Sequence, residues 1–194
     1  MSLISSSAML PRTSLVAALA SFCFAACATT ALTGNATQSP TPGPNAATAA
    51  DHRTDAPSLR GLEAIALIHG DAGIWAVAGY RMGAYALRAL DLPRGSFDLE
   101  VIHHTPQSVQ FSCIADGAAA ATGASLGKLN LSLAPATAAE TRTTYRRRST
   151  GQTITLRATE AFAARYLDVE RARLVEVGSQ VFQLPDEAIF EEVE

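Results

Sequence analysis

An uncharged apolar run near the N-terminus limits which part of this chain folds. The run Ser14–Ala26 (SLVAALASFCFAA) follows the single basic residue Arg12 and contains no charged side chain. It is shorter than the roughly 20 apolar residues that a membrane-spanning helix needs. Its length and flanks are typical of a signal-peptide core. We therefore expect residues 1–26 to be a signal peptide.

The end of this run indicates how the signal is processed. Small residues precede Cys27 in the sequence FAAC, which resembles the site where bacterial lipoproteins are cleaved and acylated. Phe24 stands where leucine is usual, and ordinary cleavage after Ala28 is the alternative. The first interpretation predicts an outer-membrane lipoprotein of the bacterial cell envelope, facing the periplasm and held to the membrane by lipid on Cys27. The second predicts a soluble periplasmic protein.

Residues 27–57 are predicted to be a disordered linker. They are mostly Ala, Thr, Pro, Gly, Asn and Ser, with scarcely any large apolar side chain. Such a segment cannot bury enough apolar surface to offset the entropy lost on ordering. Pro40, Pro42 and Pro44 favour extended polyproline geometry, which suits a spacer. Residues 58–194 remain, about the length of one ordinary domain.

The charge balance argues against nucleic acid as a partner. The chain has 15 basic and 18 acidic residues and a net charge of −3, so no global field attracts a polyanion. Its one basic run, Arg146–Arg148, is expected to be the solvated end of a strand or turn. Nucleic-acid binding is therefore not expected.

Hydrophobic periodicity predicts both helices and strands in residues 58–194. Helical spacing of apolar residues, at a period of 3.6, covers 58–68, 74–90, 109–121, 162–167, 171–177 and 186–193. Alternation of apolar and polar residues predicts strands over 97–104 and 129–133, and a hairpin of 141–148 with 153–157. Because helices and strands do not alternate strictly, the expected fold is α+β. It is a single domain with a mixed or mostly antiparallel sheet packed by helices.

Two glycines lie four residues apart in the helix predicted over 74–90. Glycine destabilises a helix interior by about 1 kcal/mol, so Gly79 and Gly83 indicate a packing reason. The run Ala118–Ala121 gives the helix predicted over 109–121 a smooth face. We expect these two helices to pack closely.

Two motifs resemble the FmdE family, which takes its name from a component of formylmethanofuran dehydrogenase. Residues 69–90 (HGDAGIWAVAGYRMGAYALRAL) are similar to the family's HGHxCPGxxxGYRxGxxAL. Residues 113–131 (CIADGAAAATGASLGKLNL) are similar to its Cys-x-x-Asp segment leading into TGxTxGKxNL. Leu184–Glu187 also looks like the end of the family domain. The resemblance covers roughly residues 60 to 190 and implies an FmdE-like fold with metal ligands.

The chain departs from the family at several of those ligands. Asp71 and Gly73 stand in place of a histidine and a cysteine, and Ala124 in place of another cysteine. The metal-ligand set that the resemblance implies is therefore depleted. In the enzyme that names the family, redox chemistry belongs to other polypeptides, and an iron–sulfur cluster needs about four thiolates. Formylmethanofuran dehydrogenase activity by this chain alone is not expected.

The remaining donors form a candidate metal site. His69, Asp71 and Cys113, with His103 or His104, offer the nitrogen, carboxylate and sulfur donors that zinc accepts. Only one histidine of an adjacent pair in a strand points inward. We predict that His69, Cys113 and one of these histidines converge on one pocket with Asp71 and Asp116 at its edge. The alternative is a pair of loop histidines and a buried, inert thiol.

A second candidate set would bind a small polar ligand. Asp116 lies one turn after Cys113, and the glycine-containing loop 123–130 carries Lys128. Tyr80 and Arg81, retained from the family motif, complete the predicted ligand-binding residues. The alternative is that Asp116 pairs with Lys128 or Arg81 and fixes the loop.

Three classes of function follow. The leading one is an exported, lipid-anchored domain that binds a metal ion, zinc foremost, or a small polar ligand, and is accessory rather than catalytic. The second is an envelope enzyme using zinc-activated water or the Cys113 thiol. The third is an interaction module whose site has decayed. The sequence also leaves open whether the chain forms a homodimer.

Overall fold

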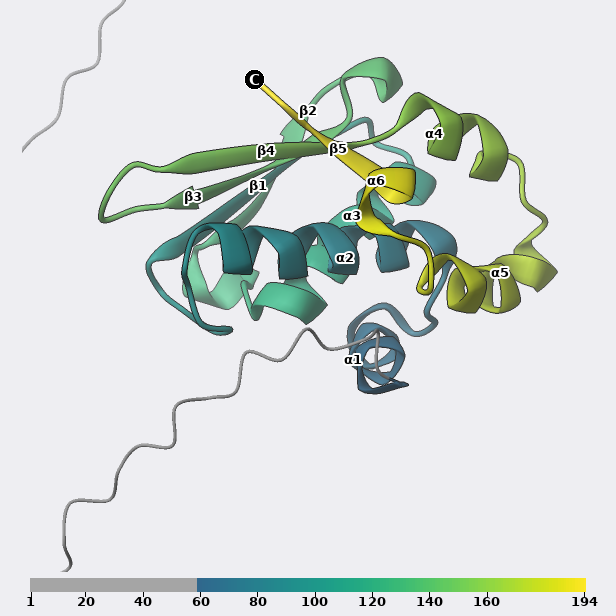
Figure 1. Cartoon of the computed structure of the whole chain (residues 1–194), viewed down its shortest axis with the longest axis horizontal. Helices are drawn as coiled ribbons and strands as arrows, with labels where there is room; N and C mark the ends of the chain where they lie inside the picture. Colours follow the sequence, from purple (N-terminus) through teal and green to yellow (C-terminus); the bar gives the residue numbers. More distant parts are fainter. Residues whose placement is uncertain (1–58) are drawn as a thin grey trace, which may run out of the picture. The chain divides into compact units, whose positions relative to one another are not determined.

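Five strands form one mixed sheet, and helices α2 and α3 pack against one of its faces (Figure 1). The structure, a computed structural model, describes residues 59–194. The predicted signal peptide, the linker and Cys27 lie outside the described residues.

Helices are α1 (Leu59–His69), α2 (Ile74–Ala89), α3 (Val109–Thr122), α4 (Glu160–Tyr166), α5 (Leu174–Val181) and α6 (Asp186–Ile189). Strands are β1 (Leu99–Thr105), β2 (Leu131–Pro135), β3 (Arg142–Arg147), β4 (Thr153–Ala158) and β5 (Phe190–Val193). Single 3-10 turns are η1 (Leu126–Lys128), η2 (Ala138–Glu140) and η3 (Arg171–Arg173).

The sheet has the order β2-β1-β3-β4-β5. Its β1–β2 pair is parallel, and its other three pairs are antiparallel. The expected hairpin is present, with β3 and β4 joined through Gly151 at φ 76°. The α+β prediction with a mixed sheet is confirmed.

Burial alternates along β1, as a half-buried strand requires. Leu99, Val101, His103 and Thr105 are buried on the helix side of the sheet. His104 therefore projects from the opposite face. The strand begins at Leu99, two residues later than expected, and Phe97 is 68% exposed.

The predicted close packing of two helices is confirmed for α2 and α3. A Cβ at Gly79 would overlap the Ile114 carbonyl, and one at Gly83 would lie 2.9 Å from the Ala121 Cβ. Gly117 contributes from α3, because a Cβ there would overlap the Ala76 carbonyl. The two backbones approach this closely because glycine has no side chain at these points.

The C-terminal segment differs from its prediction as one helix. Helix α6 has only four residues, and the chain then becomes extended at Phe190, with φ −143° and ψ 166°. Residues 190–193 form β5 and pair with β4, for example Phe190 with Ala158. The buried Phe190 ring contacts Tyr85 of α2 at 5.5 Å between centroids. Pairing with an open strand edge therefore overrides the local helical pattern.

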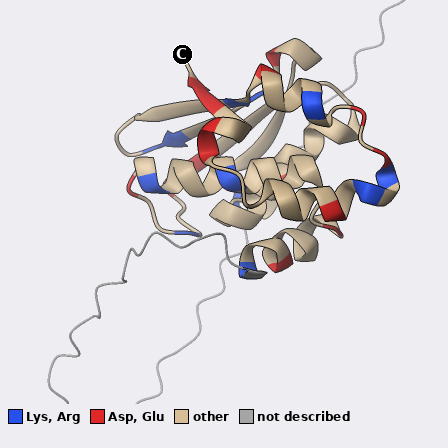
Figure 2. Cartoon of the chain, turned by 45° about the vertical axis from the view of Figure 1, so that its right-hand side comes forward, with Lys and Arg blue, Asp and Glu red and all other residues tan. Residues whose placement is uncertain are grey.

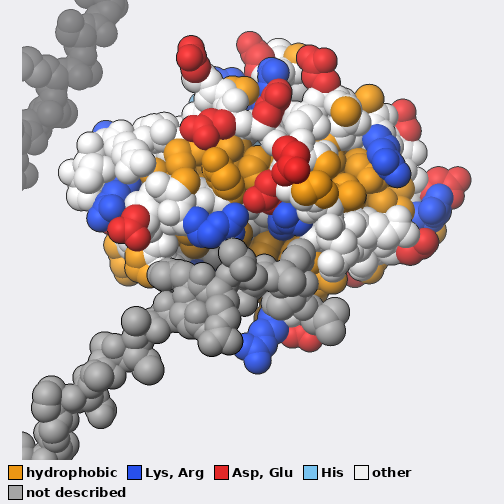
Figure 3. Space-filling view, viewed as in Figure 1, with side chains coloured by type: hydrophobic (Ala, Val, Ile, Leu, Met, Phe, Trp, Pro, Cys, Tyr) orange, Lys and Arg blue, Asp and Glu red, His pale blue; other side chains and the backbone are white. Residues whose placement is uncertain are grey.

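Charges of both signs are interspersed over the described residues (Figure 2). The Arg157 Nε lies 2.7 Å from the Glu191 carboxylate in one ion pair between neighbouring strands. On the face that carries α2, α5 and α6, apolar side chains form patches between the charged ones (Figure 3). This face therefore carries both apolar and charged side chains.

Within residues 59–194, no single helix is long and apolar enough to cross a membrane. Only α1 and α2 taken together reach that length and apolarity, and they are bent by 117°.

Candidate functional site

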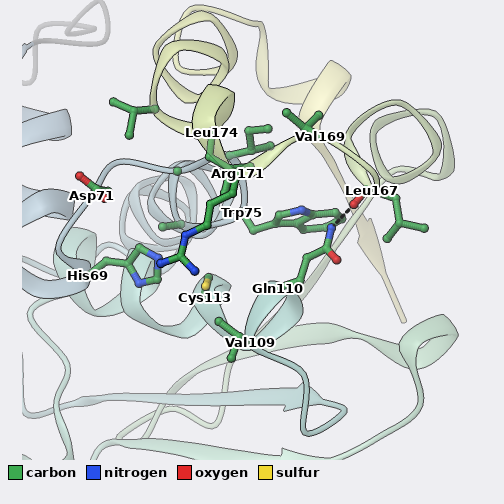
Figure 4. Close-up of a pocket in the computed structure, with 14 residues that line it drawn as sticks. His69, Asp71, Trp75, Val109, Gln110, Cys113, Leu167, Val169, Arg171 and Leu174 are labelled. Atoms are coloured by element: carbon green, nitrogen blue, oxygen red, sulfur yellow. Dashed lines mark hydrogen bonds between the residues drawn. The ribbon is translucent and has the colours of Figure 1, made fainter.

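A cavity of about 540 Å³ opens where α1 ends and α2 and α3 begin (Figure 4). The segment from Leu167 to Val175 forms its outer wall. Its polar lining consists of His69, Asp71, Gln110, Cys113 and Arg171. Its larger apolar lining residues are Ile74, Trp75, Val109, Leu167, Val169, Leu174 and Val175. Three of the predicted metal-site residues, His69, Asp71 and Cys113, therefore meet at one cavity.

Local backbone features create the cavity. Gly70, at φ 95°, ends α1 immediately after His69, and Gly73 is the N-cap of α2. The chain turns sharply between them, so the last side chain of α1 faces the first turn of α2. Gly178 of α5 packs on the backbone of Ala72, where a Cβ would overlap the carbonyl. This contact holds α5 against the turn.

A hydrogen bond to Asp116 fixes the His69 ring. The His69 Nδ1 lies 2.8 Å from Asp116 Oδ2. A carboxylate oxygen only accepts, so Nδ1 carries the hydrogen and Nε2 is left for the cavity. The two side chains are 22% and 47% exposed, which leaves this pair open to solvent on one side. Asp116 thus orients His69. The alternative interpretation, in which Asp116 pairs with Lys128 or Arg81, is wrong.

The Cys113 thiol is held in its neutral form. Burial, with a smaller contribution from the negative charge of Asp116, raises the pKa of Cys113 from its ordinary 9.0 to about 11. The thiolate is the form that attacks electrophiles and binds metals. At neutral pH the Cys113 side chain therefore acts as a small, weakly polar part of the cavity wall.

His103 lies in the core, outside the cavity lining. Its Nε2 donates to the Phe111 carbonyl at 3.1 Å, and its Nδ1 accepts from the Thr143 hydroxyl at 2.9 Å. Burial lowers the pKa of His103 to about 4, so the neutral ring is favoured. Both ring nitrogens are occupied, and the ring joins β1, β3 and α3. The expectation that His103 meets His69 and Cys113 is therefore corrected.

His104 projects from the other face of the sheet, beside Arg142 of β3. Burial and the charge of Arg142 both lower the pKa of this histidine. Neither His103 nor His104 lines the cavity. The doubled histidine thus supplies no replacement donor, because strand alternation sends one ring into the core and the other away from the helices.

Tyr80 and Arg81 contact the C-terminal segment. The Arg81 guanidinium donates to the carbonyls of Phe182 (2.7 Å) and Leu184 (2.8 Å) and to Asp186 Oδ1 (2.6 Å). The Tyr80 ring packs on Phe182, at 5.7 Å between centroids. Neither residue lines the cavity. In this structure both hold the segment after α5 against α2.

Lys128 stabilises the loop that carries it. Its Nζ donates to the Gly123 carbonyl at 2.9 Å and to the Gly95 carbonyl at 3.4 Å. The same ammonium lies 5.3 Å from the centre of the Phe97 ring. The loop's backbone is also engaged internally, since Ser125 N donates to Asn130 Oδ1. The structure does not bring Lys128 to Asp116.

The donor set fits a transition-metal site poorly. Among residues 59–194, no three His, Cys, Asp or Glu side chains are grouped closely enough to hold one ion. The Cys113 thiol is protonated, and Figure 4 shows the Arg171 guanidinium pointing toward His69. A cation at this point repels a metal ion. Zinc binding stays a prediction from the sequence, to be tested by metal analysis of the purified chain.

Three cavity residues with polar side-chain atoms, Trp75, Gln110 and Arg171, were not predicted from the sequence as site residues. Trp75, Gln110 and Arg171 were expected only as parts of the helices predicted over 74–90, 109–121 and 171–177. Arg171 comes from η3, about 100 residues after His69, and no local pattern connects the two. Trp75 is the single tryptophan of the chain, which was the one available signal.

The chain therefore forms an α+β domain with a small polar-lined site. Its features are a mixed sheet, a glycine-packed helix pair and a cavity where the helices meet. Residues 68–191 match the family described as FmdE, Molybdenum formylmethanofuran dehydrogenase operon. This match includes every residue that lines the cavity. The chain belongs to the FmdE family. A comparison with curated proteins gives no match.

Proposed function

We propose that this FmdE-family domain binds a small polar ligand in the cavity beside His69 and is accessory rather than catalytic. The observation that carries the proposal is the cavity itself. Its volume of about 540 Å³, with apolar walls and a few convergent polar groups, is typical of small-molecule sites. His69, oriented by Asp116, supplies a fixed polar atom for such a ligand.

A thiol-dependent enzyme is the second candidate, favoured by the His69–Asp116 pair. A histidine oriented by a carboxylate is what a catalytic base next to a nucleophile requires. However, no hydrogen bond joins Cys113 to His69 in the described part of the chain, and the pKa of the thiol is raised to about 11. Binding is therefore the better supported function.

Blocking the mouth of the cavity tests the binding proposal. Val109 lines the cavity and is 79% exposed, so Val109→Tyr narrows the opening without disturbing the core. Leu67→Tyr is the matched control, because Leu67 is 88% exposed on α1 and does not line the cavity. The probes are benzoate, benzamide, benzyl alcohol and benzylamine, followed by saturation-transfer NMR.

We expect at least one probe to bind the unmodified chain and the Leu67→Tyr variant, and binding to be lost in Val109→Tyr. Val175→Tyr, on α5, should have the same effect, since Val175 also lines the cavity. Failure of all four probes, or equal binding to the blocked variants, would contradict the proposal.

We also propose that the domain is exported and tethered to a membrane through lipid on Cys27. The support is the sequence alone: the uncharged run Ser14–Ala26 and the small residues before Cys27. A ligand-binding domain on a spacer beside a membrane is a coherent arrangement for an accessory envelope protein.

A further inference from the structure

Trp75 holds a buried hydrogen-bond donor that has no acceptor. The residue is 5% exposed, and no acceptor for its Nε1–H is present among residues 59–194. Buried indole N–H groups usually have a partner, since an unpaired buried donor is unfavourable. Trp75 lines the cavity, so this unpaired donor lies just behind the cavity wall and is sensitive to what packs on that wall.

The surrounding rings fix the direction of this donor. The Trp75 ring contacts Phe111 and Phe162 edge-on, at 5.5 and 5.6 Å between centroids. Figure 4 shows its ring nitrogen on the edge that faces Val169, which lines the cavity. The nearby Leu167 carbonyl already accepts from the Gln110 amide. The indole N–H therefore lies on the ring edge nearest Val169, but it is covered by protein atoms, with less than 1 Å² of the nitrogen accessible and no acceptor among residues 59–194.

Arg171 brings a positive charge to the same cavity. Within the described residues, its guanidinium has no hydrogen bond or ion pair, whereas the neighbouring Arg173 lies 3.7 Å from Glu176. Figure 4 shows the Arg171 side chain extending into the cavity toward His69. A guanidinium fork matches a carboxylate in two parallel hydrogen bonds.

We infer that the ligand is a small monocarboxylate with an apolar body. Its carboxylate accepts two hydrogen bonds from the Arg171 guanidinium, and its body packs on Trp75, Val109, Val169 and Leu174. This inference rests on the proposed function. A dianionic phosphate fits less well, because Asp71 lines the cavity and the Asp116 carboxylate lies on His69 beside it. One negative charge matches the single cation, and two would meet repulsion from these carboxylates.

The single tryptophan provides a direct test. The purified full-length chain, labelled with ¹⁵N, has one indole N–H signal in its NMR spectrum. Benzoate should shift this signal, because its ring packs on Trp75, and neutral benzamide, of the same shape, should bind at least tenfold more weakly. Arg171→Gln should weaken benzoate binding about tenfold and benzamide binding by much less, because the amide carries no charge to pair with the guanidinium. Arg173→Gln is the matched control and should change neither, since Arg173 does not line this cavity.

The outcomes separate the inference from the proposed function. Equal affinities for benzoate and benzamide, or a normal benzoate affinity in Arg171→Gln, would overturn the carboxylate inference and leave cavity binding intact. Tighter binding of phenyl phosphate than of benzoate would also overturn it. If no compound moves the indole signal and Val109→Tyr changes no binding, both the inference and the proposed function fail.

Discussion

At the scale of single residues, His103 and His69 show how burial decides what a histidine can do. His103 has both ring nitrogens engaged in the core, by Thr143 and Phe111. His69 has only Nδ1 engaged, by Asp116, and its other nitrogen is left for the cavity. Residue type alone made both candidates for metal binding. The number of unengaged nitrogens separates a structural histidine from one that can meet a ligand.

His103 should make the fold sensitive to acid. An unfolded histidine has a pKa near 6.5, whereas burial lowers the pKa of His103 to about 4. Between these values the unfolded chain binds a proton and the folded chain does not, so stability falls as the pH falls. We expect a loss of about 2 kcal/mol in the free energy of unfolding from pH 7 to pH 5. Urea denaturation at both pH values measures it.

His103→Gln provides the control for this prediction. Glutamine can donate to Phe111 and accept from Thr143 but does not titrate, so the variant should lose about 2 kcal/mol less over the same interval. His104 and the other ionisable groups are common to both proteins and cancel in the comparison. Parallel pH dependence in the two proteins would show that His103 is not the buried, neutral group described here.

Some of the candidate site could be predicted from the sequence. His69, Asp71 and Cys113 share the cavity, as the two matched motifs implied. The contribution of Arg171 could not be predicted, because η3 reaches the cavity only through the packing of α5 on the turn after α1. The donor of Trp75 was missed for a related reason: periodicity predicts that a residue is buried, but not which of its atoms lacks a partner.

At the scale of secondary-structure elements, the α2–α3 contact depends on three glycines. Gly79 and Gly117 each lie directly on the backbone of the opposite helix, and Gly83 lies on the side chains of Ala121 and Thr122. An added side chain at Gly79 therefore has to displace backbone. At Gly83 the neighbouring side chains can yield in part.

Leucine substitutions should reveal this difference. We expect Gly79→Leu to lower the free energy of unfolding by about 3 kcal/mol or more, and Gly83→Leu by about 1 to 3 kcal/mol, through overpacking. Gly127→Leu is the control, because a Cβ there meets open space. Its effect should stay within about 0.5 kcal/mol. Unchanged melting temperatures in the Gly79 and Gly83 variants would mean that the two helices are not packed this closely.

Arg81 should hold the C-terminal segment to α2. Arg81→Met keeps the aliphatic part of the side chain but leaves Asp186 Oδ1 and two carbonyls without their donor. We expect a loss of about 3 kcal/mol in the free energy of unfolding and faster amide exchange in β5. Arg88→Met is the matched control: Arg88 is 65% exposed and meets Asp186 at 3.4 Å, so its loss should matter little. Equal effects of both variants would contradict this role.

The same elements show what a sequence pattern can establish. Helices α1, α2 and α3 were predicted nearly to the residue, because a long periodic pattern, and in α1 and α3 a following glycine, depend on local sequence only. Strand β5 was not predicted, since its conformation depends on β4, more than 30 residues earlier. Leu129 also differs: it was expected in a strand, but it adopts φ 53° and lies outside β2.

At the scale of the whole molecule, the described domain is joined to a sequence whose composition predicts export. The folded residues 59–194 carry the sheet, the cavity and the matched family region. The preceding residues carry the apolar run and Cys27. If the domain binds a small carboxylate, tethering it to a membrane would confine that binding to the envelope.

Acylation of Cys27 is the remaining prediction. We expect the mature protein to begin at a lipid-modified Cys27 and to sediment with membranes, because lipid chains gain about 0.8 kcal/mol per buried CH₂ group. Cys27→Ser removes the acylated sulfur and should release the protein into the soluble fraction. Cys23→Ser is the matched control, since Cys23 lies inside the apolar run and should be removed with it. Fractionation and mass spectrometry of the N-terminal peptide measure both, and a mature N-terminus at Thr29 without lipid would establish soluble export instead.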